Sequence, residues 1–297
     1  MTPFAAQDRD RPVRIGALYR YPIKSARGQE LQRATLCDSG FMHDREWLVV
    51  DQRDVFVTQR EQPRLALLRV VLRAAAAGAP GLALDAPGMP TLELAPDAFR
   101  DRRTVRIWRD DVQALDAGDE AARWLSEWLG APFRLVRFAS GNLRLSSNEW
   151  TQGVAAPNQF SDGYPILVLG RASIADLCLR VGHALPVNRF RPNLLLEGLE
   201  PYDEDRIAEL QCGPVRLRLV KPCTRCVITT TDQERGVRTG DEPLRTLHGY
   251  RYNQALKGVM FGQNAIIDDG VGAQLEVGAA MQVTWRAPPA QQSDHQS

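Results

Sequence analysis

The sequence predicts a strand-dominated α+β protein of barrel type with a few helices. Many short runs of aliphatic and β-branched residues lie between turn signals, as in sheet-rich folds. Only a few segments place apolar residues at helical spacing, and no internal repeat is present. The chain has 297 residues, enough for one large domain or two modest domains with an ample core.

The expected strands are short and rich in residues that fit a pleated, partly buried surface. They cover residues 14–21, 46–51, 67–73, 82–84, 91–94, 104–108, 112–115, 133–138, 164–169, 194–197, 215–220, 264–268 and 275–285. Residues 85–88 form a turn signal, and residues 109–111 predict a hairpin. The alanine-rich run 74–79 is expected to be a hairpin connection or a short helical turn.

The strongest helical pattern starts at Asp119, the expected N-cap, and ends before Gly130, which suits the C-terminal cap. Its apolar stripe consists of Ala121, Trp124, Leu125, Trp128 and Leu129. A second helix is expected over residues 172–181 and a short one over residues 243–248.

The composition excludes several classes of protein. The formal net charge of +1 gives no reason to expect a nucleic acid or an anionic membrane as partner. No apolar stretch approaches the ~20 residues that span a bilayer. Residues 1–11 lack the apolar core of an export signal, and the five cysteines are an odd number. The chain is therefore expected to be cytoplasmic, where thiols stay reduced.

The most informative motif is the pair formed by Cys223 and Cys226. The β-branched run 227–230, Val-Ile-Thr-Thr, follows at once and fits a strand better than the first turn of a helix. A thioredoxin-type pair opens a helix, whose N-terminus lowers the thiol pKa. This pair is instead expected to open a strand and to have a metal-binding or structural role.

Four short clusters combine cations with polar neighbours, namely residues 24–25, 43–46, 189–193 and 224–226. Arginine and lysine beside hydroxyl or amide groups on loops suit phosphate binding. Each cluster taken alone is more simply a group of surface charges.

Several common sites are not indicated. A zinc site would need a second pair of ligands, and Cys37, Cys178 and Cys212 form no such pair. Glycine-rich nucleotide loops, zinc-protease motifs and the serine-hydrolase elbow are absent from the sequence. The residues alone therefore indicate a thiol with several candidate anion-binding clusters.

Six ordered segments carry a resemblance to a known family. They are residues 21–25 (Tyr-Pro-Ile-Lys-Ser), 40–47 (Gly-Phe-Met-His-Asp-Arg-Glu-Trp), 188–193 (Asn-Arg-Phe-Arg-Pro-Asn), 223–226 (Cys-Thr-Arg-Cys), 242–247 (Glu-Pro-Leu-Arg-Thr-Leu) and 261–263 (Phe-Gly-Gln). The chain resembles the MOSC family, named for the C-terminal domain of molybdenum cofactor sulfurase. In particular it is similar to the two-part members, which include the mitochondrial amidoxime-reducing component and bacterial reductases of N-hydroxylated compounds.

The resemblance implies a domain organisation. An N-terminal MOSC β-barrel-like domain is expected over residues 12–130 and a MOSC domain over residues 131–286. Flexible tails are expected at residues 1–11 and 287–297, where the sequence is polar and contains proline.

The resemblance also implies a site. In that family the second cysteine of the pair holds the molybdenum of the pterin cofactor, and here it is Cys226, a soft ligand. Cys223 is then a packed neighbour. The implied cofactor contacts are Lys24, Ser25, Arg45, Asp162, Arg191, Asn193, Thr224 and Arg225. Arg225 is also expected to neutralise developing oxyanion charge, so the predicted catalytic residues are Cys226 and Arg225. Relatives carry small hydroxyl residues where this chain has Gly163 and Tyr164, so only backbone contacts are expected there.

The implied activity is reduction of the N–OH group of a small substrate to N–H with Mo-molybdopterin. Some relatives append a ferredoxin-like domain, whose cysteine-rich [2Fe–2S] loop this chain lacks. A separate electron-donor protein of ferredoxin, flavin or haem type is therefore expected. The targeting or membrane segment of the mitochondrial members is also not expected.

Two other classes remain open. MOSC domains also accompany cofactor sulfurases, so the same cysteine and cations would suit a non-catalytic carrier of molybdenum cofactor or sulfur. Pyridoxal phosphate binding is not expected, because the sulfurase domain with its lysine is absent. The third reading is an interaction module that binds no cofactor.

Overall fold

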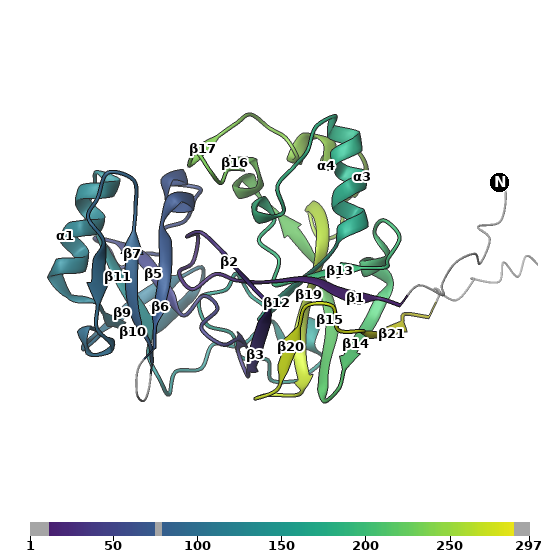
Figure 1. The fold of residues 1–297 in the computed structure, drawn as a ribbon, viewed down its shortest axis with the longest axis horizontal. Helices are drawn as coiled ribbons and strands as arrows, with labels where there is room; N and C mark the ends of the chain where they lie inside the picture. The colour runs from purple at the N-terminus through teal and green to yellow at the C-terminus, as the bar shows by residue number, and fades with distance from the viewer. Residues whose placement is uncertain (1–11, 75–78, 288–297) are drawn as a thin grey trace, which may run out of the picture.

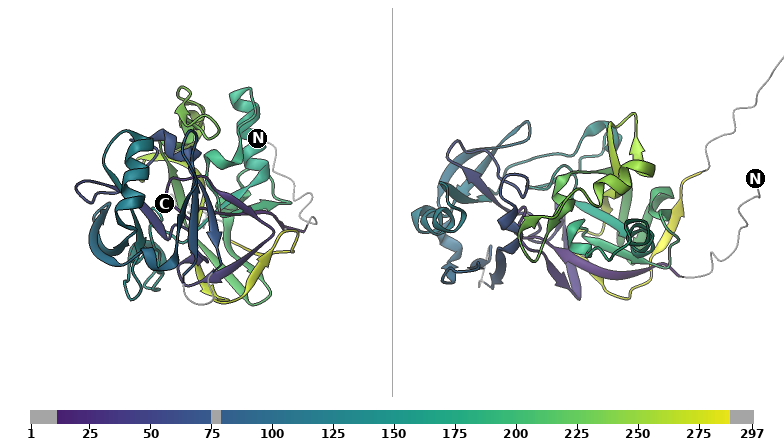
Figure 2. Two further views of the ribbon diagram at one scale, coloured as in Figure 1. Left: turned by 60° about the vertical axis from the view of Figure 1, so that its left-hand side comes forward. Right: turned by 90° about the horizontal axis from the view of Figure 1, so that it is seen from above.

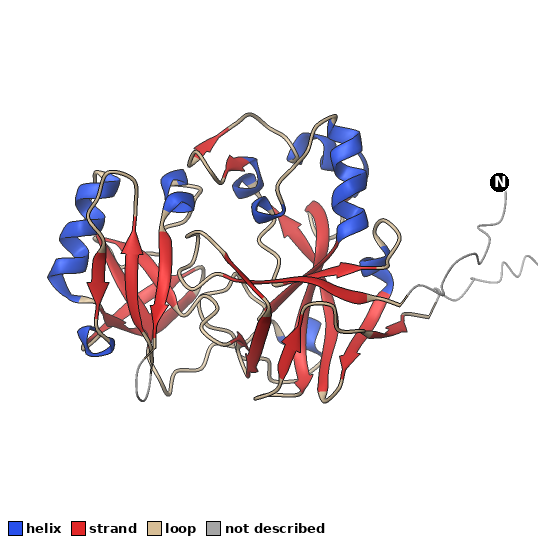
Figure 3. Ribbon diagram, in the orientation of Figure 1, coloured by secondary structure: helices blue, strands red, loops and turns tan. Residues whose placement is uncertain are grey.

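The computed structural model describes residues 12–74 and 79–287 and confirms a strand-dominated α+β fold. Two lobes lie side by side (Figure 1). Residues 47–74 and 79–138 form the first lobe. The second contains residues 14–41 and most of the described chain after residue 148. The lobes stay separate in the view from above (Figure 2), and strands fill both of them while helices lie at the margins (Figure 3).

The first lobe contains mostly antiparallel strands and one long helix. In chain order its elements are β5 (Trp47–Asp51), η1 (Pro63–Leu67), β6 (Arg69–Arg73), β7 (Gly81–Asp85), β8 (Leu92–Leu94), η2 (Pro96–Ala98), β9 (Asp101–Ile107), β10 (Asp110–Asp116), α1 (Gly118–Leu129) and β11 (Phe133–Phe138). They form one sheet in the order β5-β11-β10-β9 and another in the order β6-β7-β8.

The remaining elements come from both ends of the chain. They are β1 (Arg14–Arg20), β2 (Gln29–Leu31), β3 (Arg33–Cys37), β4 (Gly40–Phe41), α2 (Asn148–Thr151), β12 (Ile166–Gly170), α3 (Arg171–Val181), η3 (Val187–Arg189), β13 (Leu194–Glu197), η4 (Asp203–Arg206), β14 (Ile207–Cys212), β15 (Val215–Arg225), η5 (Val227–Thr230), β16 (Thr231–Asp232), β17 (Val237–Arg238), α4 (Leu244–Arg251), β18 (Tyr252–Asn253), β19 (Gly258–Asp269), β20 (Gln274–Glu276) and β21 (Gln282–Trp285).

The second lobe is built on a nine-stranded sheet that joins the two ends of the chain. Its order is β2-β1-β13-β12-β19-β15-β14-β21, with β18 added beside β19. β1 pairs antiparallel with β13, where Leu18 lies opposite Leu194, and β3 pairs with β20. The chain therefore builds part of the second lobe before it enters the first. The predicted domain division at residue 130 stays a prediction.

Each lobe has its own apolar core. Trp47, Leu65 and Leu135 are among the buried residues of the first core, and the whole predicted stripe of α1 is buried against it. Leu18 and Leu194 lie in the second core, between the nine-stranded sheet and β3. Burial of each such large side chain contributes about 1.5–3 kcal/mol, so each lobe carries a substantial hydrophobic term. Within the described residues, no helix combines the length and apolar character needed to cross a membrane.

Most predicted strands are confirmed to within two or three residues, but several details are wrong. Asp119 is not the N-cap of α1, because the helix begins at Gly118, whose N–H is bound by Asp116 Oδ1 at 2.7 Å. The predicted strand 275–285 is two strands, since Gly278 adopts a φ of +86° and reverses the chain between β20 and β21. The predicted connection 74–79 and the predicted tails lie largely outside the described residues.

The prediction that the cysteine pair opens a strand is also wrong. Cys223 lies near the end of β15, and Cys226 is the residue before the 3₁₀ turn η5, which contains the β-branched run. The hydroxyls of Thr229 and Thr230 donate to the carbonyls of Cys226 and Val227, at 2.9 and 2.8 Å. These local bonds satisfy carbonyl groups that a strand would have directed to a neighbouring strand, and they outweigh the β preference.

A carboxyl group is buried where η4 packs against the start of α3. Glu204 is 0% exposed, its Oε2 accepts a hydrogen bond from Ser173 Oγ at 2.7 Å, and burial raises its pKa. A carboxyl whose pKa is higher in the folded state binds its proton more tightly when folded. It therefore stabilises the fold at acidic pH, and this contribution is lost as the pH rises through the folded pKa.

The substitution Glu204→Gln removes this dependence on pH. At pH 8 we expect the variant to melt about 2–4 °C above the wild type, because the amide is never charged. Below pH 4.5 the difference should vanish. Thermal unfolding followed by circular dichroism across this pH range measures both values, with the exposed Glu200→Gln as control. A lower melting temperature for Glu204→Gln at pH 8 would contradict the assignment.

Candidate functional site

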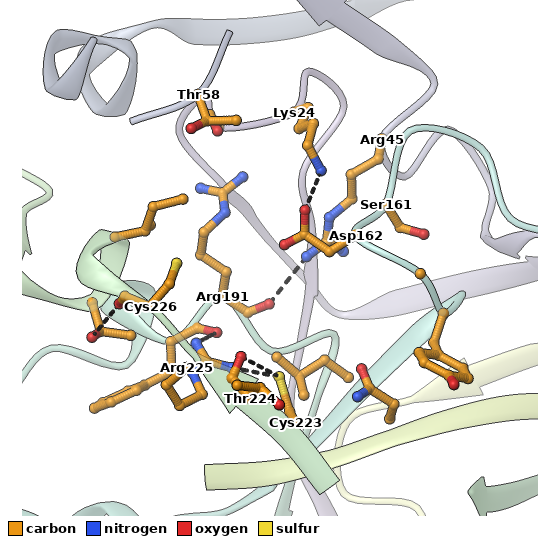
Figure 4. A pocket seen from close by; sticks show the side chains of 18 of the residues that line it. Lys24, Arg45, Thr58, Ser161, Asp162, Arg191, Cys223, Thr224, Arg225 and Cys226 are labelled. Atoms are coloured by element: carbon orange, nitrogen blue, oxygen red, sulfur yellow. Dashed lines mark hydrogen bonds and ion pairs between the residues drawn. The ribbon is translucent and has the colours of Figure 1, made fainter. Parts of the chain in front are cut away.

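One pocket lies between the lobes, where several loops meet the end of β15 (Figure 4). Its walls come from the loop after β1, the turn after β4, and the loops before β12 and β13. The lining residues are Lys24, Ser25, Arg45, Thr58, Ser161, Asp162, Gly163, Tyr164, Leu167, Phe190, Arg191, Asn193, Cys223, Thr224, Arg225, Cys226, Ile228, Thr229 and Asn264.

The structure brings every residue of the predicted site into this lining. They are Lys24, Ser25, Arg45, Asp162, Arg191, Asn193, Thr224, Arg225 and Cys226. Cys226 is partly exposed and lines the pocket. Convergence of these residues is a geometric finding, whereas their roles toward a cofactor stay predictions.

Three lining residues adopt a backbone conformation that side chains other than glycine rarely take. Ser25, Arg45 and Arg191 have φ angles of 66°, 50° and 55°. A bulky residue in the left-handed region costs of order 1–3 kcal/mol, so such strain persists only where the surrounding structure enforces it. Strained residues cluster at functional sites, and these three lie in one pocket.

A buried tyrosine supports two of the cations. Tyr21 is 1% exposed, and the guanidinium carbons of Arg45 and Arg191 lie 4.4 and 4.2 Å from its ring centroid. Arg191 Nη1 also donates to Ala26 O at 2.6 Å. Stacking on an aromatic face offsets part of the cost of placing two like charges together.

Asn193 and Asp44 form a buried network that fixes Arg45. Asn193 Nδ2 donates to Asp44 Oδ2 at 3.0 Å, while its Oδ1 accepts from Arg45 Nη1 at 2.9 Å. Asp44 Oδ1 accepts from Tyr21 N at 2.7 Å, and Arg45 forms an ion pair with Asp44. Because each buried polar group has partners, the network holds its geometry without leaving an uncompensated charge.

Lys24 is the cation whose charge is most sensitive to its surroundings. Its Nζ donates to Phe160 O at 2.8 Å and to Asp162 Oδ1 at 2.6 Å, which leaves one N–H for a ligand. Burial lowers the pKa of Lys24 to about 8, and Asp162 only partly offsets this effect. Asp162 is largely exposed, and although loss of hydration would raise the pKa of its carboxyl, the charges of Lys24, Arg60 and Arg45 together lower it.

The two sulfur atoms have different arginine partners. Arg60 Nη2 lies 3.2 Å from Cys226 Sγ, and Arg225 Nη1 lies 3.1 Å from Cys223 Sγ. Arg225 Nη2 is bound to Phe190 O at 2.6 Å, which holds that guanidinium toward Cys223. The cation that contacts the predicted metal ligand is therefore Arg60, a residue that the sequence analysis missed.

The sequence analysis also missed Thr58 and Ser161, which line the pocket. Arg60 and Thr58 lie in a loop of the first lobe, between β5 and η1, where nothing in the local pattern separates them from surface residues. Ser161 precedes Asp162, and its position beside that predicted residue was the one available signal.

The pocket fits a cofactor that is anionic and bound through sulfur. Arg191 Nη2 and Arg225 Nε are buried and have no hydrogen-bond partner among the described residues. A buried donor left without an acceptor costs roughly 1–3 kcal/mol, and phosphate or pterin oxygens would satisfy both donors. The described residues hold no cluster of three or more His, Cys, Asp or Glu side chains. A metal held by a pterin and one thiolate needs no such cluster.

Comparisons with known proteins identify the family of the chain. One family model, described as the MOSC N-terminal beta barrel domain, matches residues 13–132, and another, the MOSC domain, matches residues 155–282. Mitochondrial amidoxime reducing component 2 of Bos taurus is 35% identical over 249 residues, which cover 80% of this chain and 72% of the relative. Mitochondrial amidoxime-reducing component 1 of Mus musculus is 34% identical, with 84% and 76% covered.

A likeness to solved structures is weaker. The YUAD protein of Bacillus subtilis covers 93% of this chain and 97% of its own, but it is 9% identical with a TM-score of 0.40. This likeness supports no further argument.

The lowered pKa of Lys24 predicts that anion binding in the pocket weakens in alkaline solution. Sulfate is a suitable probe because its charge is constant above pH 7. We expect its affinity for the cofactor-free protein to fall about fivefold between pH 7 and pH 9.5, as one of several cations loses its proton. Isothermal titration calorimetry measures this dependence.

The matched control for this titration is Lys24→Met, which has no proton to lose. The variant should bind sulfate more weakly than the wild type at pH 7 and with the same affinity at pH 9.5. An equal loss of affinity with pH in both proteins would show that another group is responsible.

Proposed function

This chain belongs to the family of the amidoxime-reducing components, with a MOSC N-terminal domain followed by a MOSC domain, and we propose that it reduces N-hydroxylated compounds with a molybdenum cofactor bound at Cys226. The observation that supports this most strongly is the convergence of a partly exposed thiol and four cationic side chains on one pocket.

The reaction takes an N–OH group to N–H. One N–O bond is broken, two electrons and two protons are consumed, and the oxygen leaves as water. Bound molybdenum supplies the two-electron redox chemistry, which no side chain of the pocket provides.

The residues of the chain have separate tasks in this proposal. The Cys226 thiolate would hold the metal, and Arg60 would place a positive charge beside that sulfur. Arg45, Arg191 and Lys24 would bind the phosphate and pterin oxygens, because their donors face the same pocket. Arg225 donates to Phe190 O and Cys223 Sγ. We therefore propose cofactor binding as its main role, ahead of a role in neutralising charge on the substrate.

The electrons have to come from outside this site. We propose a separate donor protein of ferredoxin, flavin or haem type. A cytoplasmic location is also part of the proposal, and the five free cysteines of the described chain are compatible with a reducing compartment.

The two cysteines provide the test. Cys226→Ser should lose nearly all bound molybdenum and all reduction of an amidoxime, because a serine hydroxyl is a poor ligand for this soft metal. Cys223→Ser should keep most of both, since that thiol is a neighbour. Elemental analysis gives the metal content, and turnover is measured with an artificial electron donor.

The pattern of results separates the proposed function from its alternatives. Molybdenum bound at Cys226 without turnover, together with transfer of the cofactor to another enzyme, would indicate a carrier. Equal molybdenum content in Cys226→Ser and the wild type would exclude the assigned ligand.

A further inference from the structure

A second groove opens directly beside the cofactor pocket. It is lined by Trp108, Arg109, Asp110, Arg144, Leu145, Ser147, Asp162, Gly163, Tyr164 and Lys221. Asp162, Gly163 and Tyr164 line both cavities, so the groove adjoins the pocket. We refer to it below as the side groove.

A single side chain, that of Arg60, lies between one end of the side groove and Cys226, the predicted metal ligand. The ring centroid of Trp108 lies 4.9 Å from the guanidinium carbon of Arg60, whose Nη2 is 3.2 Å from Cys226 Sγ. A molecule that rests against Trp108 is therefore close to the sulfur where the reaction is proposed to occur.

Two aromatic side chains, Trp108 and Tyr164, form part of the wall of the side groove. Trp108 forms the tip of the β9–β10 hairpin with a φ of 56°, packs against Phe56 at 4.9 Å between centroids, and is still 43% exposed. A large aromatic residue at a left-handed turn position is unusual, because glycine or asparagine is favoured there. Tyr164 forms another wall, and its buried hydroxyl has no hydrogen-bond partner among the described residues. Flat, rigid faces of this kind suit stacking of a planar ring.

The charges of the side groove are not balanced. Asp110 is bound to Arg144 Nε at 2.7 Å, and Asp162 is bound to Lys24. Lys221 and Arg109 have no ion-pair partner within residues 12–74 and 79–287. Both acidic residues of the lining are therefore neutralised, and two cations are left for a ligand.

Lys221 lies over two aromatic rings and forms no ion pair within the described part of the chain. Its Nζ lies 5.2 Å from the ring centroid of Trp150 and 5.9 Å from that of Tyr164. Burial, and to a lesser extent the charge of Glu149, raises the pKa of Tyr164 to about 12. Glu149 does not line the side groove. The ammonium group is thus positioned at an aromatic wall and is available to an anion.

We propose that the side groove binds the organic part of the substrate and selects N-hydroxylated compounds that carry an aromatic ring and an anionic substituent. The ring stacks beside Trp108 and Tyr164, the N–OH group points toward Cys226, and the anion pairs with Lys221 and Arg109. This inference rests on the proposed function, and it adds a substrate preference to it.

Three amidoximes of similar shape test the preference. They are benzamidoxime, its 4-carboxy derivative and the methyl ester of that derivative, which is larger but neutral. For the wild type we expect the KM of the carboxylate to be about five- to tenfold below that of the ester, with similar kcat values, because partly exposed charge pairs contribute modestly. Added salt should reduce the difference.

Substitution of the cation then assigns the effect to the side groove. Lys221→Gln should bring the two KM values to within about twofold of each other, while Lys221→Arg keeps the preference because it keeps the charge. Lys257→Gln, on an exposed lysine that does not line the side groove, is the control and should behave as the wild type. Arg109→Gln should weaken the preference in part.

A binding measurement separates failure of this inference from failure of the proposed function. 4-Carboxybenzamidine and its methyl ester carry no N–OH group, and their dissociation constants are measured by quenching of tryptophan fluorescence. Tighter binding of the carboxylate that is lost in Lys221→Gln supports the inference even if no amidoxime is turned over. Equal binding of acid and ester to the wild type, or a preference that survives in Lys221→Gln, overturns it.

Discussion

The antiparallel pairing of β1 with β13 is the constraint on which the rest of the structure depends. It places Leu18 opposite Leu194. The start of the chain is thereby paired with a strand that follows the whole first lobe in the sequence. The loop after β1 and the turn after β4 are thereby carried to the end of β15, where Cys226 lies. Without this long-range pairing, Lys24 and Arg45 would have no defined position relative to the sulfur.

The electrostatics of the pocket indicate a binding site and not only a contact between two lobes. Four cations line one pocket. The ring of Tyr21 and the carboxylates of Asp44 and Asp162 stabilise three of them, namely Lys24, Arg45 and Arg191. Within the described residues, two guanidinium donors of this pocket lack acceptors, and three of its residues hold strained backbone conformations. A site shaped only for stability would not accumulate like charges, unsatisfied donors and strain together. An anionic ligand relieves the first two.

Much of this site was predictable because its residues occur in short ordered segments that resemble a family. The residue types alone were enough to predict the cationic clusters at positions 24–25, 45, 191–193 and 224–226. The structure brings these clusters together in one pocket. Their convergence was not predictable from local pattern, since it depends on pairings between distant strands. Arg60 was missed for this reason, because its contact with Cys226 joins two lobes. The 3₁₀ turn after Cys226 was missed because hydroxyl bonds to nearby carbonyls overrode the β preference of its residues.

We propose that Cys226 ligates a molybdenum whose organic part lies among Lys24, Arg45 and Arg191. Anomalous diffraction at the molybdenum absorption edge, from crystals of the cofactor-loaded protein, tests it most directly. We expect one strong anomalous peak within bonding distance of Cys226 Sγ, with the cofactor phosphate among these three cations. A peak at another residue, or a phosphate outside this pocket, would contradict it.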